Sequence, residues 1–188
     1  MSFKIRAKEF LAATWIVAVF TLLAAANAPM AVAAQPGADT PPAVEKVNPR
    51  EKCPVCGMFV ARYPNWISQL HLDGGETLHF DGMKDLLAYY FNPESFGGKK
   101  EAEVKAVWAK DYYTLQWVEA RQAHFVVGSN VHGPMGHEFI PLDSRQAAEN
   151  FMKEHQGREI LTFDEITPEK VRMMRTGHQM KMKMKMGH

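Results

Sequence analysis

The chain contains only two cysteines among its 188 residues, Cys53 and Cys56. A disulfide between them would close a very short loop and remove little entropy from the unfolded chain. Their spacing is instead typical of metal binding or thiol redox chemistry. The chain also lacks a Ser/His/Asp triad pattern, a glycine-rich phosphate loop and a zinc-hydrolase motif, so no pattern indicates a catalyst. Its basic residues form no aromatic-lined patch, which excludes nucleic acid as a partner.

The first 34 residues predict export. Three basic residues precede an apolar stretch at 10–26, and small residues follow up to Ala34. This layout is typical of a secretory signal peptide, and we predict cleavage after Ala33 or Ala34. The alternative is a retained segment that anchors the chain in a membrane. No cysteine stands at the end of the signal sequence, so we expect no lipid attachment there. In either case the protein is expected in the periplasm or at the outer face of the membrane.

The rest of the chain predicts an α+β fold. Residues 35–49 contain four prolines and predict an extended linker. Two stretches then repeat the same order of patterns, so we predict two similar β-β-α-β subdomains, at 50–113 and at 114–176. Residues 177–188 form a tail of methionine, lysine and histidine.

Periodicity and turn residues locate the expected elements. In the first subdomain we expect strands at 66–72, 76–80 and 104–113, with a helix from a cap at Asp81 to about residue 91. In the second we expect strands at 117–127, 137–142 and 159–163, with a helix capped by Asp143 or Ser144 that runs to residue 155. A short helix at 168–175 closes the body.

The strongest chemical pattern is the segment 53–58, with the sequence CPVCGM. It holds two thiols and the thioether of Met58, and such sulfur ligands select Cu(I) over harder metals. A zinc site is one alternative, but it needs a second ligand pair that only histidines could supply. A thiol-disulfide oxidoreductase is the other alternative, but its cysteines should precede a helix, and residues 59–64 are a poor helix start.

A second candidate sulfur ligand is Met135, within the segment 132–137 (HGPMGH). Glycine and proline around Met135 predict a turn, where a thioether can be presented to a metal. His132 and His137 are auxiliary candidates. The alternative is a methionine packed on the end of a hairpin between solvated histidines. For His79, Phe80, Asp81 and Met83 we expect a helix cap and core contacts, and for Asp111, Tyr112 and Trp117 packing between the subdomains.

These residues together resemble the NosL family, the accessory copper protein of nitrous-oxide reductase. The resemblance covers about residues 50–165 and rests on the segments 53–58, 80–83, 111–112, 117–120, 128–129 and 133–136. It implies a pair of β-β-α-β subdomains, distantly like a fold found in organomercurial lyase. It also implies that Cys56 supplies the metal thiolate and Met135 the distant thioether, with Cys53 and Met58 as second choices. Typical members are lipoproteins and lack a Met-Lys tail, so the chain departs from the family pattern at both ends.

We therefore predict an exported Cu(I)-binding chaperone that is not an enzyme. Its cargo is Cu(I), and its partner is a copper-dependent reductase, with nitrous-oxide reductase expected, or the assembly factors of that enzyme. Membrane association through the N-terminal segment is the accompanying expectation. The alternative function is a thiol-disulfide oxidoreductase that cycles Cys53 and Cys56.

The tail alternates lysine with Met180, Met182, Met184 and Met186. Alternation places four thioethers on one side of an extended segment, an arrangement that suits weak and exchangeable capture of Cu(I). Because the tail has too few residues of the right kind to build a core, we expect it to be disordered without metal. The alternative is a solvated basic tail without a function.

Truncation after Thr176 is predicted to remove the weaker Cu(I) equivalents, or to slow copper transfer, and to leave binding by the body intact. The reason is that the tail carries four of the 12 methionines. Titration against a Cu(I) chelator measures the stoichiometry, and unchanged stoichiometry together with an unchanged transfer rate would exclude the tail from the mechanism.

Overall fold

The computed structural model describes residues 43–99 and 103–186, with side chains described up to Gly177. The predicted signal segment and most of the linker lie outside these residues. Contacts group residues 40–188 into one compact body, and the following description concerns that body. No helix in the described ranges is both long and apolar enough to cross a membrane.

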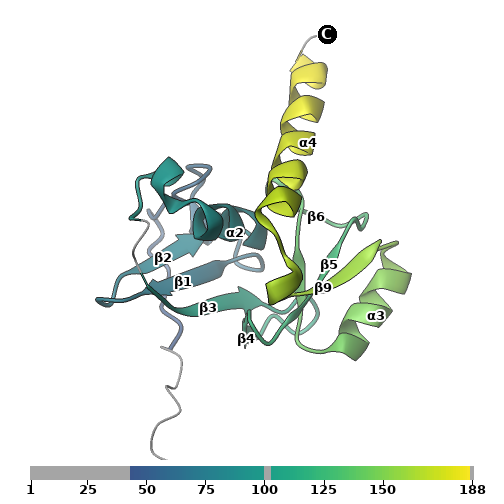
Figure 1. Ribbon diagram of the computed structural model, residues 1–188, viewed down its shortest axis with the longest axis horizontal. Coiled ribbons are helices and arrows are strands. Elements are labelled where there is room, and N and C mark those ends of the chain that lie inside the picture. Colours follow the sequence, from purple (N-terminus) through teal and green to yellow (C-terminus); the bar gives the residue numbers. More distant parts are fainter. Residues whose placement is uncertain (1–42, 100–102, 187–188) are drawn as a thin grey trace, which may run out of the picture. The chain divides into compact units, whose positions relative to one another are not determined.

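The first sheet has four antiparallel strands in the order β2-β1-β3-β4 (Figure 1). They are β1 (Ser68–Leu72), β2 (Thr77–Phe80), β3 (Val104–Lys110) and β4 (Trp117–Glu119). Gly74 and Gly75 form the turn between β1 and β2 with φ of 86° and 85°, a conformation that glycine adopts without strain. Helix α2 (Met83–Phe91) contacts β1 and β2 and ends at Asn92, as predicted.

The second sheet has three antiparallel strands in the order β8-β5-β9. They are β5 (His124–Val127), β8 (Ile140–Leu142) and β9 (Glu159–Thr162). Helix α3 (Arg145–Glu154) contacts all three strands, and the Ser144 side chain caps it by accepting the Ala147 N–H at 3.2 Å. A small hairpin of β6 (His132–Gly133) and β7 (Gly136–His137) leaves this sheet between β5 and β8.

The two sheets share one topology, because in each the first strand lies between the second and the last strand of a β-β-α-β unit. The predicted α+β class is confirmed. One apolar cluster nevertheless crosses from sheet to sheet, since Leu70, Phe80 and Val107 of the first belong to the same core as Phe125 and Leu161 of the second. The two units are therefore packed as one body.

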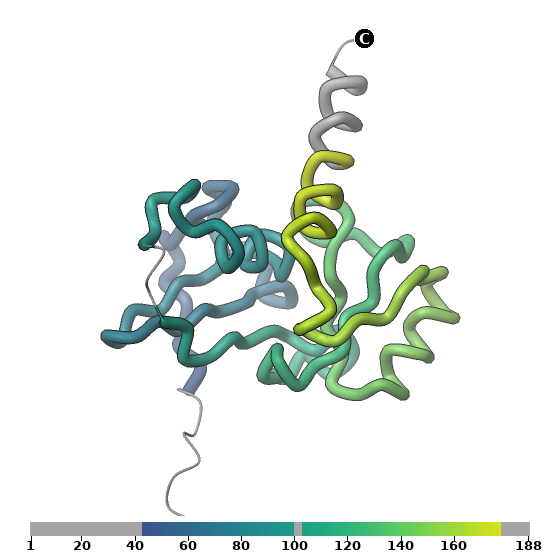
Figure 2. The backbone as a smooth tube through the Cα atoms, viewed as in Figure 1, coloured from purple at the N-terminus to yellow at the C-terminus, as the bar shows by residue number. Residues whose placement is uncertain are grey.

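Three short 3-10 turns and a C-terminal helix complete the described chain. They are η1 (Val60–Arg62), η2 (Pro93–Phe96), η3 (Phe163–Glu165) and α4 (Pro168–Met186). Helix α4 follows β9 and η3, as the backbone trace in Figure 2 shows. It contacts α2.

Three sequence-based expectations about these elements are wrong. The single strand expected at 137–142 is two strands, because β7 pairs with β6 in the small hairpin and β8 pairs with β5 in the second sheet. The single strand expected at 117–127 is two strands: β4 pairs with β3 in the first sheet, and β5 enters the second after a turn at 120–122. The first sheet therefore crosses the predicted boundary between residues 113 and 114. The tail is also not extended, because α4 continues to Met186 instead of ending near residue 175. Methionine, lysine and glutamine are good helix formers, so local propensity favours this continuation.

A buried carboxylate joins the second unit to the start of α2. Glu138 is 4% exposed, and its Oε1 accepts the backbone N–H groups of Lys84 at 2.5 Å and Phe139 at 3.0 Å. It thereby satisfies an N–H group that the first turn of a helix leaves without an intrahelical partner. A Cβ on Gly82 would lie 2.3 Å from Glu138 Oε2, so glycine is needed there for close approach.

Glu138→Gln is predicted to flatten the pH dependence of stability. Burial raises the pKa of Glu138 from an ordinary 4.5 to about 8, although the Lys84 ammonium opposes the shift. The folded state then keeps a proton that the unfolded state releases, so the free energy of unfolding falls as pH rises between these values. Glutamine keeps an acceptor oxygen and cannot titrate, so a slope of up to about 1.4 kcal/mol per pH unit should be lost. Urea unfolding at several pH values measures it, and equal slopes for both proteins would contradict the prediction.

Candidate metal site

A tight loop presents the two cysteines. The Cys53 N–H donates to the Met58 carbonyl at 2.8 Å, and the Gly57 N–H donates to the Cys53 carbonyl at 2.9 Å. Gly57 has a φ of 76°, which allows the chain to turn back sharply. Both cysteines are free thiols, with Cys53 only 1% exposed and Cys56 half-buried. Cys53 is therefore enclosed, whereas Cys56 is partly exposed.

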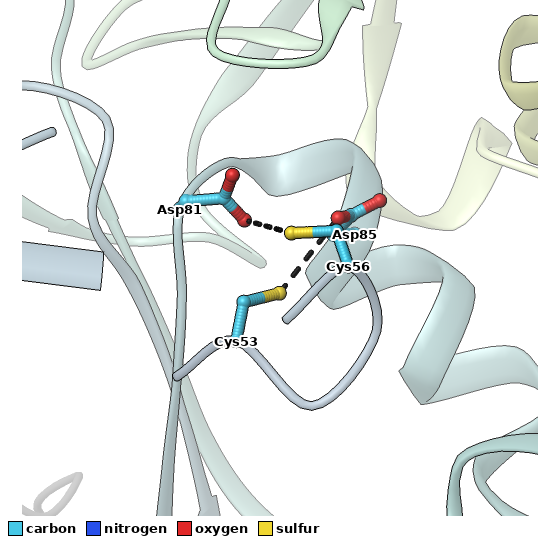
Figure 3. Close-up of side chains that lie close together, drawn as sticks. All are labelled: Cys53, Cys56, Asp81 and Asp85. Carbon is cyan, nitrogen blue, oxygen red and sulfur yellow. Dashed lines mark hydrogen bonds between the residues drawn. The ribbon is translucent and has the colours of Figure 1, made fainter. Parts of the chain in front are cut away.

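The start of α2 places two carboxylates against these thiols (Figure 3). The Cys56 Sγ donates to Asp81 Oδ1 at 3.1 Å, and the Cys53 Sγ lies 3.7 Å from Asp85 Oδ2 as a weaker donor. Asp81 ends the connection from β2, and Asp85 lies four residues later in the first turn of the helix. One ligand atom from each of the four residues lies within 4.8 Å of the others. The four donors form a cluster of the size that one metal ion requires.

The cluster is electrostatically prepared for a cation. Asp81 and Asp85 are 1% and 4% exposed, and among the described residues Asp81 Oδ2 is buried without a hydrogen-bond partner. A buried acceptor in this state is costly unless an ion, a proton or a water molecule satisfies it. The donor set therefore fits a bound metal ion.

The Cys56 thiol is held in its protonated form. A hydrogen bond with Cys53 and then burial raise the pKa of the Cys56 thiol well above its usual range. Burial likewise raises the pKa of Asp85, although the Arg175 guanidinium, with Nε at 3.9 Å, opposes this. A metal ion must displace the thiol protons when it binds, so binding releases protons.

The predicted sulfur ligands are distributed over two places. Cys53 and Cys56 lie in the cluster, and Met58 follows them with a half-buried side chain. Met135 lies in the turn between β6 and β7, and its carbonyl accepts the Lys84 ammonium at 2.6 Å. Lys84 precedes Asp85, so this turn is attached to the helix that carries the carboxylates.

The two predicted auxiliary histidines lie on that same hairpin. His132 and His137 are directly opposite each other on β6 and β7, and their ring centroids are 4.7 Å apart. Neither belongs to the four-donor cluster. The side chains of Met180, Met182, Met184 and Met186 lie outside the described residues.

Sequence reasoning missed both carboxylates of the cluster. The expected role of Asp81 as the cap of α2 is wrong: Gly82 occupies the cap position without a side-chain cap, and the Asp81 carboxylate contacts Cys56 instead. Asp85 was not singled out at all. The usable signal was a pair of carboxylates four residues apart at a predicted helix start, one just before the helix and one in its first turn.

The expected packing role of Asp111 is confirmed. Asp111 is 1% exposed, and its Oδ1 accepts the backbone N–H groups of Tyr113 and Thr114. Its Oδ2 accepts the Asp143 N–H of the second unit at 2.8 Å. Asp111 therefore organises a turn and joins the two units.

Comparison with known proteins identifies related chains. The NosL family model matches residues 43–171, which bears out the resemblance drawn from the motifs. The copper-binding lipoprotein NosL of Achromobacter cycloclastes is 28% identical over 124 residues, covering 60% of this chain and 61% of that protein. The chain thus matches about three fifths of the length of this curated relative. The crystal structure of the copper chaperone NosL from Shewanella denitrificans superposes with a TM-score of 0.58 and 26% identity, over 68% of this chain and 98% of that one. Both relatives are named as copper proteins and not as enzymes, in agreement with the prediction that this chain is no enzyme.

Iodoacetamide is predicted to alkylate Cys56 well before Cys53 in the metal-free protein, by at least about tenfold in rate, because reaction requires access to the sulfur. Intact mass of Cys53→Ser and Cys56→Ser, followed over time, measures each thiol separately. Asp81→Asn should accelerate alkylation of Cys56, because Asp81 contributes to the raised thiol pKa. Asp73→Asn, in an exposed turn, is the matched control. Equal rates for the two thiols would contradict the described burial.

Proposed function

We propose that this chain, which belongs to the NosL family, binds Cu(I) as cargo at the loop of Cys53 and Cys56 and delivers it to a copper enzyme. Cys56 is the principal ligand in this proposal. Met135 and Met58 are its sulfur partners, and Cys53 is a further thiolate. His132 and His137 are auxiliary ligands.

The observation that supports copper binding most directly is the four-donor cluster of Cys53, Cys56, Asp81 and Asp85 within 4.8 Å. Its donor atoms converge on one place, so a single ion can contact several of them. Thiolate ligands favour Cu(I) over harder cations. The family relationship agrees with this choice, since the two relatives are named for binding or carrying copper.

The difference in exposure between the two thiols supports delivery. An enclosed Cys53 retains the ion while the accessible Cys56 can be reached by a ligand of another protein. Copper can then pass by exchange of one ligand at a time, without release of the free ion. Protons return to the thiols as copper leaves, and the raised pKa of Cys56 favours this step.

The thiol-disulfide oxidoreductase is less well supported. A redox thiol requires a lowered pKa, commonly from a helix N-terminus or a basic neighbour. Here a hydrogen bond with Cys53 and burial raise the pKa of Cys56, and the nearest charged groups are carboxylates. Reduction of insulin by the metal-free protein would favour this alternative.

The proposed recipient is nitrous-oxide reductase or one of its assembly factors, following the family that the motifs resemble. The proposed location is the periplasm or the outer face of the membrane. The export pattern at 1–34 supports this location, and the Achromobacter relative is named as a lipoprotein.

Cys56→Ser and Met135→Ala are each predicted to weaken Cu(I) binding by at least about tenfold, because each removes a sulfur ligand and even outer-shell changes cost that much. Competition with bicinchoninate under anaerobic conditions measures the affinity. Met152→Ala, a half-buried methionine on α3, is the matched control and should bind as the unmodified chain does. If neither Cys56→Ser nor Met135→Ala changes the affinity, the ligand assignment is wrong. Anaerobic mixing of the copper-loaded protein with apo nitrous-oxide reductase then tests the recipient by the appearance of its copper absorption.

A further inference from the structure

A groove of about 480 Å³ lies along one side of α4, between this helix and strands β5 and β7. Three of its lining residues carry soft or borderline metal donors: His137 on β7 and the neighbouring Met173 and Met174 on α4. We infer that this groove is a second Cu(I) site, formed by the two thioethers and the imidazole. The inference rests on the proposed copper function and gives it an additional step.

The exposure of the two methionines supports a role beyond packing. Met174 is half-buried and packs against the main core, which accounts for part of its side chain. Met173 is 64% exposed, more than any other large apolar side chain among the described residues. Neighbouring residues on a helix project about 100° apart, yet both side chains border the same groove. Two thioethers on one wall are a ligand pair that Cu(I) accepts and that hard cations do not.

The third ligand comes from a backbone segment held in place. The His137 carbonyl accepts the Lys84 ammonium at 2.8 Å, and the His137 ring contacts that of His132 with an angle of 45° between the ring planes. The position of β7 beside the groove is thus fixed from both sides. An imidazole can bind a metal through one ring nitrogen while the other keeps a hydrogen bond, so such contacts are compatible with ligation.

The charges of the groove oppose a divalent cation more strongly than a monovalent one. Glu159 is the only acidic residue among those that line it, and both of its oxygens accept the Lys170 ammonium at 2.7 Å. Arg158 adds a further positive charge at the lining. A divalent hard cation would need several anionic oxygens that this groove does not offer. Neutral sulfur and nitrogen donors can hold Cu(I) without them.

The two walls of the groove contact α2, the helix next to the thiol cluster. Arg175 follows Met174 and pairs with Asp85 of the cluster, while Lys84 holds the backbone of His137. Both walls of the groove therefore contact α2 at residues 84–85. Met173 and Met174 lie beyond residues 43–171, so the match to the family model does not include these two ligands. We assign to this site the transient holding of copper on its way to or from Cys56.

Methyl NMR of the full chain with labelled methionine tests the inference directly. Once a first equivalent of Cu(I) has filled the thiol site, a second should shift the ε-methyl signals of Met173 and Met174. Met173→Leu combined with Met174→Leu keeps the apolar volume, removes both sulfurs, and should weaken binding of the second equivalent at least about tenfold. Met152→Leu on α3 is the matched control, and circular dichroism checks that every variant folds.

The outcomes separate this inference from the proposed function. Shifted groove methyls in Cys56→Ser, where the thiol site is impaired, support the second site even if the main assignment fails. Binding at the thiols with unmoved Met173 and Met174 signals overturns the second site alone. Shifts confined to Met180, Met182, Met184 and Met186, with additional equivalents lost only on truncation after Thr176, also overturn it in favour of the tail.

Discussion

The hydrogen bond from the Lys84 backbone to the buried Glu138 carboxylate fixes where α2 begins, and the geometry of the metal site depends on that position. With the helix starting at Met83, Asp81 and Asp85 both face the cysteine loop. Gly82 lies between them because any side chain would collide with Glu138. The ammonium of the same lysine holds the hairpin that carries Met135 and His137. A contact between the two units thus sets the donors of the cluster and attaches the hairpin to the same helix turn.

The charge of the cluster limits what it can bind and how. Two thiolates and two carboxylates around one Cu(I) would leave an excess of negative charge in a buried place, and a single Arg175 guanidinium could not balance it. Sulfur is the better ligand for Cu(I), so in the proposed loaded site the ion lies on the thiols and the two carboxylates lie beside it. Their role is then to accept hydrogen bonds from the thiols in the empty site and to adjust the local charge in the loaded one.

Local sequence patterns predicted most of the fold. Alternating apolar residues and the Asp73-Gly74-Gly75 turn located β1 and β2, and Asn92-Pro93 located the end of α2. The division of 117–127 was not predicted because the turn at 120–122 contains neither glycine nor proline, so nothing local marks the end of β4. The candidate site was also predicted only in part. The two cysteines are visible as a local motif, whereas Asp81 and Asp85 become part of the cluster only when the fold brings α2 against a loop 25 or more residues earlier.

On the proposed function, oxidation gives a physical reason for combining thiols with thioethers in one copper protein. Thiolates of Cys53 and Cys56 would bind Cu(I) strongly, but in the proposed oxidising compartment the thiols would be open to oxidation. Thioethers cannot form disulfides, and they bind Cu(I) weakly enough to exchange it. Copper held on Met173 and Met174 would therefore stay available when the cysteines are oxidised, and it would move to them once they are reduced because thiolate binds more tightly. The direction of transfer would then follow from ligand strength alone, without any conformational change in the sheets.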